Sequence, residues 1–333
     1  MVLPFAYLKT SKFLGGSTNM KELFENISRA LFSELMDQEA LAVNWIAERT
    51  EFVRFNAGKI RQNTFVNQIY LHLEMQTTLG ICARSGITLT GDFTIDKPRA
   101  IHALKVLRQD MAHLPPDPYM VAMTNAGSSS EVHEGFLPSL HELVGSIHEF
   151  SGGMDLAGMW CGGDIYRGNA NSLGQCHWYE TRSFFLDWSL YTADQKAVKA
   201  IYAGRKWSPE ELRSKMEMAK LQLGIMNRPK IRVPKGRHRA YLAPAAVTEF
   251  VGIMGWGGFG LQASRSGEGA LRDLEIGVKQ LSPMVTWAEN LALGVSPRFN
   301  CFGEVGPEYL PLVEQGKFKN FLVSTRSAKQ YGG

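Results

Sequence analysis

The first regular pattern of apolar and polar positions starts near Met20 and predicts an amphipathic helix. Its apolar residues recur at every fourth position, which places them on one helix face; they are Leu23, Ile27, Leu31 and Leu35. The polar run 17–19 (Ser-Thr-Asn) supplies an N-cap. From residue 40 to residue 87 apolar and polar residues alternate instead, which predicts antiparallel strands, and the corner at 56–58 (Asn-Ala-Gly) suits a hairpin turn.

A second helix is predicted after these strands. Asp96 is its expected N-cap, and its apolar positions are Ile101, Leu104, Val106 and Leu107. The helix ends before the prolines of segment 114–118, because proline cannot continue a helix. Residues 20–115 are therefore predicted to form an N-terminal α+β domain of helix, antiparallel sheet and helix, preceded by an extension at residues 1–19.

A central α/β segment is predicted for residues 116–227. Its first elements are a polar loop, a helix and two alternating strands, at 125–135, 137–150, 154–168 and 181–192. Its last helix begins at Ser208 and reaches about Ile225. Ser208 is a good N-cap, and the proline and two glutamates that follow it are favoured in a first helical turn.

The rest of the chain is predicted to be a basic linker and a C-terminal β-rich domain. The linker, residues 228–239, leads into a strand near residue 240. The stretch 241–260 then shows a proline turn, a helix and a glycine-rich exit, and the residues after it show loops and strands with a hairpin turn at 314–317. We expect this domain, residues 240–333, to be incomplete at its C-terminal end. The predicted fold class is α+β: the helix–antiparallel-sheet–helix domain is followed by a mainly antiparallel β C-terminal domain with a few helices.

Composition indicates a globular protein of the cytoplasm. Apolar residues make up 44% of the 333 residues and charged residues 20%, which is ordinary, and the net charge of +4 does not suggest a nucleic-acid partner. The longest uncharged apolar run, 250–261, contains five glycines and is far shorter than the ~20 residues of a membrane helix. The N-terminus lacks the features of a signal peptide. The cysteines form no CxxC pair and are expected to be free thiols; they are Cys82, Cys161, Cys176 and Cys301.

Three His-Glu pairs resemble parts of a zinc-protease motif, but their spacing argues against a shared metal. His141 and His148 are separated by seven residues, about 10 Å of helical rise, whereas two histidines on one zinc ion each bind at about 2 Å. His133 lies outside that helix. A self-sufficient metalloprotease built on these histidines is therefore disfavoured. Cys176 and His177 are adjacent on a strand and point to opposite faces, so a buried structural cysteine is expected there.

The string 165–180 (IYRGNANSLGQCHWYE) is the most unusual polar stretch of the chain. Amide side chains can both donate and accept hydrogen bonds, which suits contact with a peptide backbone. Candidate peptide-binding residues are Tyr166, Arg167, Asn169 and Asn171. A turn in which the asparagines satisfy their own backbone explains the same string, so both interpretations stay open. The basic run 228–239 is broken by two prolines, which favours a solvated linker over nucleic-acid contact.

At this string the sequence resembles the TldD/PmbA family, the modulators of DNA gyrase whose TldD and TldE subunits form a peptide-cleaving metalloprotease. The string 167–174 (RGNANSLG) is similar to a family block of glycine, Ala-Asn-Ser and glycine. Three further stretches are similar to family blocks in family order: 51–62, 240–254 and 312–332. The resemblance implies an α+β N-terminal domain and a C-terminal domain of antiparallel β structure.

The resemblance also places a catalytic motif, His-Glu-x-x-x-His in TldD-type members, on residues 248–253. Glu249 matches the glutamate that acts as general base, but Thr248 and Ile253 stand where the histidines would be. Isoleucine has no ligand atom, and a general base needs a metal-bound water to act on. This implies a PmbA/TldE-like chain with no catalytic residue, metal or cofactor of its own and inactive alone. We expect Glu249 to hydrogen-bond near the N-terminal turn of its helix.

The resemblance further implies a partner. Zinc is expected in a TldD-like subunit, with which this chain would form a heterodimer that cleaves unfolded peptides. The remaining family ligand, a cysteine, would lie beyond residue 333. The alternative function is a non-enzymatic binding or regulatory protein that acts by association, as a homodimer, and the gyrase-modulator name of the family is the only hint of its partner.

Overall fold

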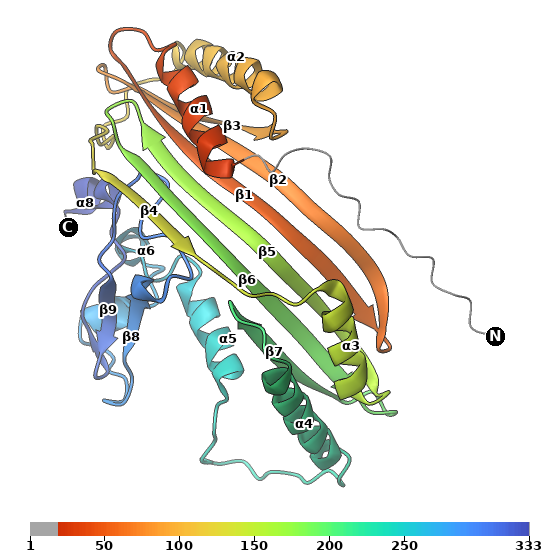
Figure 1. The fold of residues 1–333 in the computed structure, drawn as a ribbon. Helices are drawn as coiled ribbons and strands as arrows, with labels where there is room; N and C mark the ends of the chain where they lie inside the picture. The colour runs from red at the N-terminus through yellow and green to blue at the C-terminus, as the bar shows by residue number, and fades with distance from the viewer. Residues whose placement is uncertain (1–18, 333) are drawn as a thin grey trace.

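The computed structural model describes residues 19–332, and its main feature is one long twisted sheet (Figure 1). Its strands are β1 (Glu39–Asn56), β2 (Lys59–Thr77), β3 (Cys82–Leu89), β4 (Ser128–His133), β5 (Asp155–Asn171), β6 (Cys176–Tyr191) and β7 (Ala197–Gly204). The strand order is β3-β2-β1-β5-β6-β4, and β7 pairs with another part of β6. Only β4, which runs parallel to β6, departs from antiparallel pairing in this sheet. The α+β fold class is therefore confirmed.

Helices α1 (Met20–Phe32) and α2 (Phe93–Met111) cover one end of this sheet. Asn19 caps α1 by accepting hydrogen bonds from two backbone amides, as predicted. The predicted cap of α2 is wrong, because Asp92 is the N-cap and accepts from the Thr94 amide. Asp96 lies in the first turn with its side chain fully buried, where it accepts from the backbone amides of Thr90 and Gly91. The loop before the helix folds back onto this carboxylate.

Helices α3 (Leu140–Ser151) and α4 (Pro209–Met226) cover the other end of the sheet (Figure 1). Val43 of β1 packs in the core beneath α1 and α2, and Val53 of the same strand packs in the core beneath α3 and α4. Because residues an even number of positions apart on a strand point to the same face, both helix pairs lie on one face of the sheet. The predicted cap Ser208 accepts from the Glu211 amide at the start of α4. The predicted structure around Ser208 is thus confirmed.

The sheet is continuous across the boundary predicted near residue 115. Residues 42–55 of β1 pair with residues 158–171 of β5 without a break in register. The N-terminal domain and the central segment drawn from the sequence therefore contribute strands to one sheet. The hairpin corner predicted between β1 and β2 is also present, with Ala57 and Gly58 at positive φ.

The C-terminal unit (residues 244–332) is built from short elements around a small core of its own. They are α5 (Pro244–Gly255), α6 (Leu261–Ser266), α7 (Arg272–Glu275), β8 (Trp287–Asn290), the 3-10 helix η1 (Leu291–Leu293), β9 (Tyr309–Glu314), β10 (Lys317–Phe318) and α8 (Thr325–Tyr331). The hairpin turn at 314–317 is confirmed, with Gln315 and Gly316 at positive φ. The strand expected near residue 240 is wrong, because residues 227–243 contain neither helix nor strand.

Residues 240–332 carry more helix than the sequence pattern predicted. Helices α6, α7 and α8 have four to seven residues, too few to show an apolar period. No helix within residues 19–332 has the length and apolar content needed to cross a membrane. The first 18 residues, most of the predicted extension 1–19, lie outside the described part of the chain.

Candidate functional site

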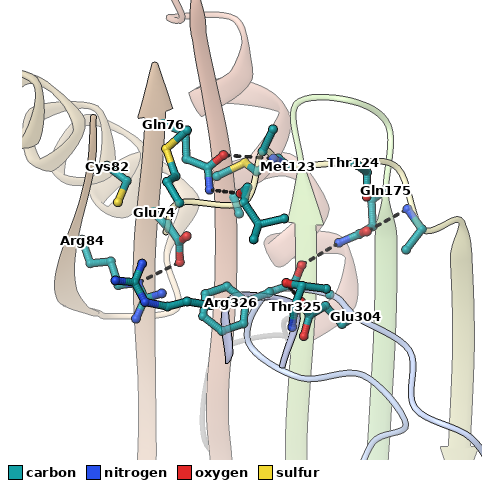
Figure 2. Close-up of a pocket in the computed structure, with 17 residues that line it drawn as sticks. Glu74, Gln76, Cys82, Arg84, Met123, Thr124, Gln175, Glu304, Thr325 and Arg326 are labelled. Atoms are coloured by element: carbon teal, nitrogen blue, oxygen red, sulfur yellow. Dashed lines mark hydrogen bonds and ion pairs between the residues drawn. The ribbon is translucent and has the colours of Figure 1, made fainter. Parts of the chain in front are cut away.

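The C-terminal unit packs on the sheet face opposite the four long helices, and this contact encloses a pocket. Three contacts bring the unit onto β5 and β6. Asn169 donates to the carbonyl oxygen of Cys301, Tyr179 donates to that of Gly294, and the ring of His177 stacks on Phe299. A pocket of about 220 Å³ lies at this junction, between β2, β3, the extended segment 120–126, the loop 302–304 and the start of α8 (Figure 2).

One wall of the pocket is formed by alternate residues of β2. Glu74, whose side chain is only 10% exposed, accepts a hydrogen bond from Arg84 Nε at 2.8 Å, and the Arg84 guanidinium lies 4.8 Å from the centre of the Phe302 ring. Two positions further along β2, Gln76 donates to the Val121 carbonyl oxygen and accepts from the Met123 amide. Gln76 thus holds the segment 120–124 as a neighbouring strand would.

The outer wall carries a second ion pair, between Asp117 and Arg326 of α8. The hydrogen bonds from Arg326 hold the pKa of Asp117 below its usual range. The Cys82 thiol donates to Asp117 at 3.7 Å, and burial together with this carboxylate raises the pKa of Cys82. A raised pKa keeps the thiol protonated near neutral pH, so Cys82 is not a reactive nucleophile. The pocket is lined by groups of both charges, among them Glu74, Arg84, Glu304 and Arg326.

The amide side chains of the string 165–180 hold the pocket together. The Asn169 side chain is fully buried, donates to Asn44 Oδ1 at 2.8 Å and accepts from Gln175 Nε2 at 2.6 Å. Asn171 donates to the carbonyl oxygen of Thr124 and accepts from the Gln175 amide. Gln175 itself lines the pocket. The structure therefore brings Asn169 and Asn171 together, one behind the C-terminal loop and one behind the segment 120–126.

The other two predicted peptide-binding residues lie on opposite faces of β5. Tyr166 packs in the core beneath α1, beside Trp178, and burial raises the pKa of Tyr166 to about 12. Arg167 lies on the open face, where it donates to the carbonyl oxygens of Ala47 and Tyr166 and forms no ion pair with a carboxylate of residues 19–332. Burial lowers the pKa of Arg167. Peptide contact by these four residues stays a prediction.

The residues at the family motif lie on α5, and Thr248, Glu249 and Ile253 are exposed. Thr248 Oγ1 donates to the carbonyl oxygen of Pro244 at 2.9 Å, and 75% of the Ile253 surface is exposed. The hydrogen bond expected for Glu249 near the N-terminal turn is wrong, because Glu249 is the sixth residue of α5, beyond its first turn. The hydrogen bond that Lys199 donates to Asp187 and, to a smaller extent, the charge of Glu249 raise the pKa of Lys199, so α5 lies near β7.

The residues on α5 do not fit a zinc ion. A zinc site needs three or four nitrogen, sulfur or oxygen ligands around one point. Ile253 has no such atom, and the Thr248 hydroxyl is engaged with the helix backbone. Within residues 19–332 no three side chains of the His, Cys, Asp and Glu types are grouped in a way that could hold a metal.

The remaining sequence candidates have local roles. His133 lies on β4 with its ring 5.5 Å from that of Tyr179, whereas His141 and His148 lie on α3. Cys176 packs against the core beneath α1, and burial raises its pKa. His177 points to the other face, where its Nδ1 lies 2.9 Å from Ser129 Oγ. The opposite orientation predicted for Cys176 and His177 is confirmed.

The fold matches solved structures, although neither a protein-family model nor a curated protein matches the sequence. TldE from Thermococcus kodakarensis is 14% identical, with a TM-score of 0.68 over 93% of this chain and 72% of that one. A protein from Thermotoga maritima described as a candidate modulator of a DNA gyrase is 15% identical, with a TM-score of 0.67 over 93% and 73%. A candidate DNA gyrase modulator from Bacteroides thetaiotaomicron is 11% identical, with a TM-score of 0.64 over 94% and 74%. This chain has the fold of these proteins.

Similarity to the TldE fold fits the resemblance found in the sequence. The sequence did not, however, predict the residues that line the pocket. Glu74, Gln76 and Arg84 occupy ordinary alternating positions of predicted strands. One feature of the sequence could have indicated them: charged or amide side chains occur at positions 74 and 76, on one face of a strand whose opposite face is apolar. The sequence did not indicate that the C-terminal unit would cover that face.

Proposed function

We propose that this chain is a TldE/PmbA-like member of the TldD/PmbA family that has no metal site of its own and pairs with a zinc-bearing TldD-like subunit. One observation carries the proposal. Helix α5 presents Glu249 between Thr248 and Ile253, the positions at which the resembled TldD-type motif has its two histidines. The similarity to the TldE structure supports the same conclusion.

Proteolysis in the proposed pair comes from the partner. A carboxylate acts as a general base in a metalloprotease when it faces a metal-bound water, and the neighbours of Glu249 cannot hold the metal. Glu249 instead lies exposed on α5. This chain therefore contributes surface to the pair and contacts to an unfolded peptide. We place the pair in the cytoplasm, where free thiols such as Cys82 stay reduced.

Peptide contacts are proposed for the sheet face that carries Arg167. Within residues 19–332 its guanidinium donates only to backbone carbonyl oxygens, so donors remain for a peptide carbonyl or carboxylate. Asn169 and Asn171 contribute by fixing the two walls of the pocket. Tyr166 supports the strand from the core side. An Arg167→Lys variant keeps the charge but loses the planar fork of donors, so it tests the geometry of this contact.

The proposal is tested by purifying this chain alone, a TldD-like protein alone and the two after co-expression. Zinc content and cleavage of an unfolded peptide are measured for each preparation. We expect a stable pair, zinc in the TldD-like protein, and cleavage that depends on both proteins. Stoichiometric zinc and cleavage in this chain alone would overturn the proposal. A homodimer that ignores every TldD-like protein would favour the regulatory alternative.

A further inference from the structure

Helix α5 is apolar over most of its surface, although much of it faces solvent. Glu249 is the only charged residue among its 12 residues. Val251 and Met254 pack against the core of the C-terminal unit. On another side of the helix Phe250 is 59% exposed and Ile253 75% exposed, and Trp256, directly after the helix, is 93% exposed. No residue of α5 is fully buried.

Such a helix is unusual on a free surface. A surface helix normally turns a polar face to water, whereas a helix that is apolar all round is buried in the working assembly. A contiguous exposed patch of aromatic and aliphatic side chains marks an interaction site. We name Phe250, Ile253 and Trp256 the α5 surface.

A basic segment leads directly into this helix. Residues 228–239 contain six cations, all of them exposed; they are Arg228, Lys230, Arg232, Lys235, Arg237 and Arg239. None of the six forms an ion pair with a carboxylate of residues 19–332, although 14 other lysine and arginine side chains of the described chain do. Unpaired cations beside an apolar patch are complementary to a partner whose apolar groove is bordered by acidic residues.

We propose that the α5 surface and the basic segment are the docking site for the TldD-like subunit, which presents an apolar groove with an acidic border. This inference rests on the proposed function, because it assigns the surface used by the proposed pair. The aromatic side chains of Phe250 and Trp256 are the anchors, since buried aromatic residues dominate the affinity of protein interfaces. The six cations steer the encounter and fix its orientation.

A second copy of this chain fits the surface less well. A twofold dimer through α5 would place the same patch on both subunits face to face. It would also bring two basic segments close together, and like charges across an interface are destabilising. A bilayer fits less well for another reason. Glu249 is next to Phe250 and one helical turn before Ile253, so inserting this face would desolvate its carboxylate. A protein partner can supply a hydrogen-bond donor to that carboxylate.

The test measures binding of the TldD-like subunit to wild-type chain and to variants of the full chain. We expect the double variant Phe250→Ser/Ile253→Ser and the single variant Trp256→Ser to weaken binding at least tenfold. The matched control is Met218→Ser/Leu221→Ser on α4, where the two side chains are 56% and 65% exposed. This control is expected to bind within twofold of wild type. Thermal melting checks that all variants fold.

A second set of variants tests the role of the basic segment in association. Arg237→Glu/Arg239→Glu should slow association severalfold, and the wild-type association rate should fall as salt is raised. The matched charge control is Lys97→Glu/Lys105→Glu on α2, at the other end of the sheet, which should leave the rate unchanged. Equal rates for both charge variants would remove the basic segment from the docking site.

Each result decides between explanations. If wild-type chain pairs and cleaves but the α5 variants pair equally well, the docking site is overturned and the proposed function stands. If wild-type chain pairs with no TldD-like protein, both fail. Sedimentation of this chain alone measures whether a second copy occupies the α5 surface. A homodimer that the α5 variants abolish would overturn the proposal. Binding to phosphatidylglycerol vesicles that the same variants abolish, with pairing unchanged, would overturn it in favour of a bilayer.

Discussion

Replacing Asn169 by alanine should loosen the C-terminal unit from the sheet. The Asn169 side chain is fully buried and makes three hydrogen bonds, to Asn44 Oδ1 at 2.8 Å, to the Cys301 carbonyl oxygen at 3.0 Å and from Gln175 Nε2 at 2.6 Å. A neutral hydrogen bond contributes roughly 1 kcal/mol net, so the loss of three lowers the free energy of unfolding by about 3 kcal/mol. Any partner left unpaired away from water adds to this loss.

Urea unfolding of wild type and Asn169→Ala at one pH measures this free energy. Asn63→Ala is the control, because Asn63 lies on an exposed part of β2 and should change stability by less than about 0.5 kcal/mol. Limited proteolysis adds a local readout, with faster cleavage expected in the 294–304 region of the Asn169 variant. A loss below about 1 kcal/mol, or equal proteolysis, would refute the role assigned to this amide network.

The other predictions concern the same fold. Gly303→Ala should lower the melting temperature, because Gly303 has φ +74° and an added Cβ would lie 1.7 Å from Gln175 Nε2; unchanged melting would contradict this contact. The hydrogen bond from Arg108 lowers the pKa of Glu39 below 4.5, so its stabilisation is complete above pH 4.5 and disappears as pH falls through the lowered pKa. Unfolding midpoints between pH 3 and 6 should therefore depend less on pH in Arg108→Met than in wild type. Glu249→Gln should leave peptide cleavage by the assembled pair within twofold of wild type; loss of cleavage with intact pairing would assign it chemistry.

Local signals in the sequence determined most of the secondary structure. Helix α1 begins at the predicted cap Asn19, α4 begins after Ser208, and both predicted hairpin corners adopt positive φ. Each of these caps and turns depends on residues within one helical turn or one hairpin turn, so the local sequence is enough to predict it. The sequence also determined what α5 lacks, since Thr248 and Ile253 cannot become zinc ligands in any fold.

Only the tertiary structure decided where the site lies, because its contacts join residues far apart in the chain. Asn169 bonds residues 125 positions before it and 132 positions after it, and Asp117 pairs with Arg326 209 positions away. Asp96 shows the same limit locally, since its burial depends on how the preceding loop folds back. The pocket and the α5 surface both depend on which sheet face the C-terminal unit covers. Alternation along a strand separates its two faces, but it cannot say what packs on either one.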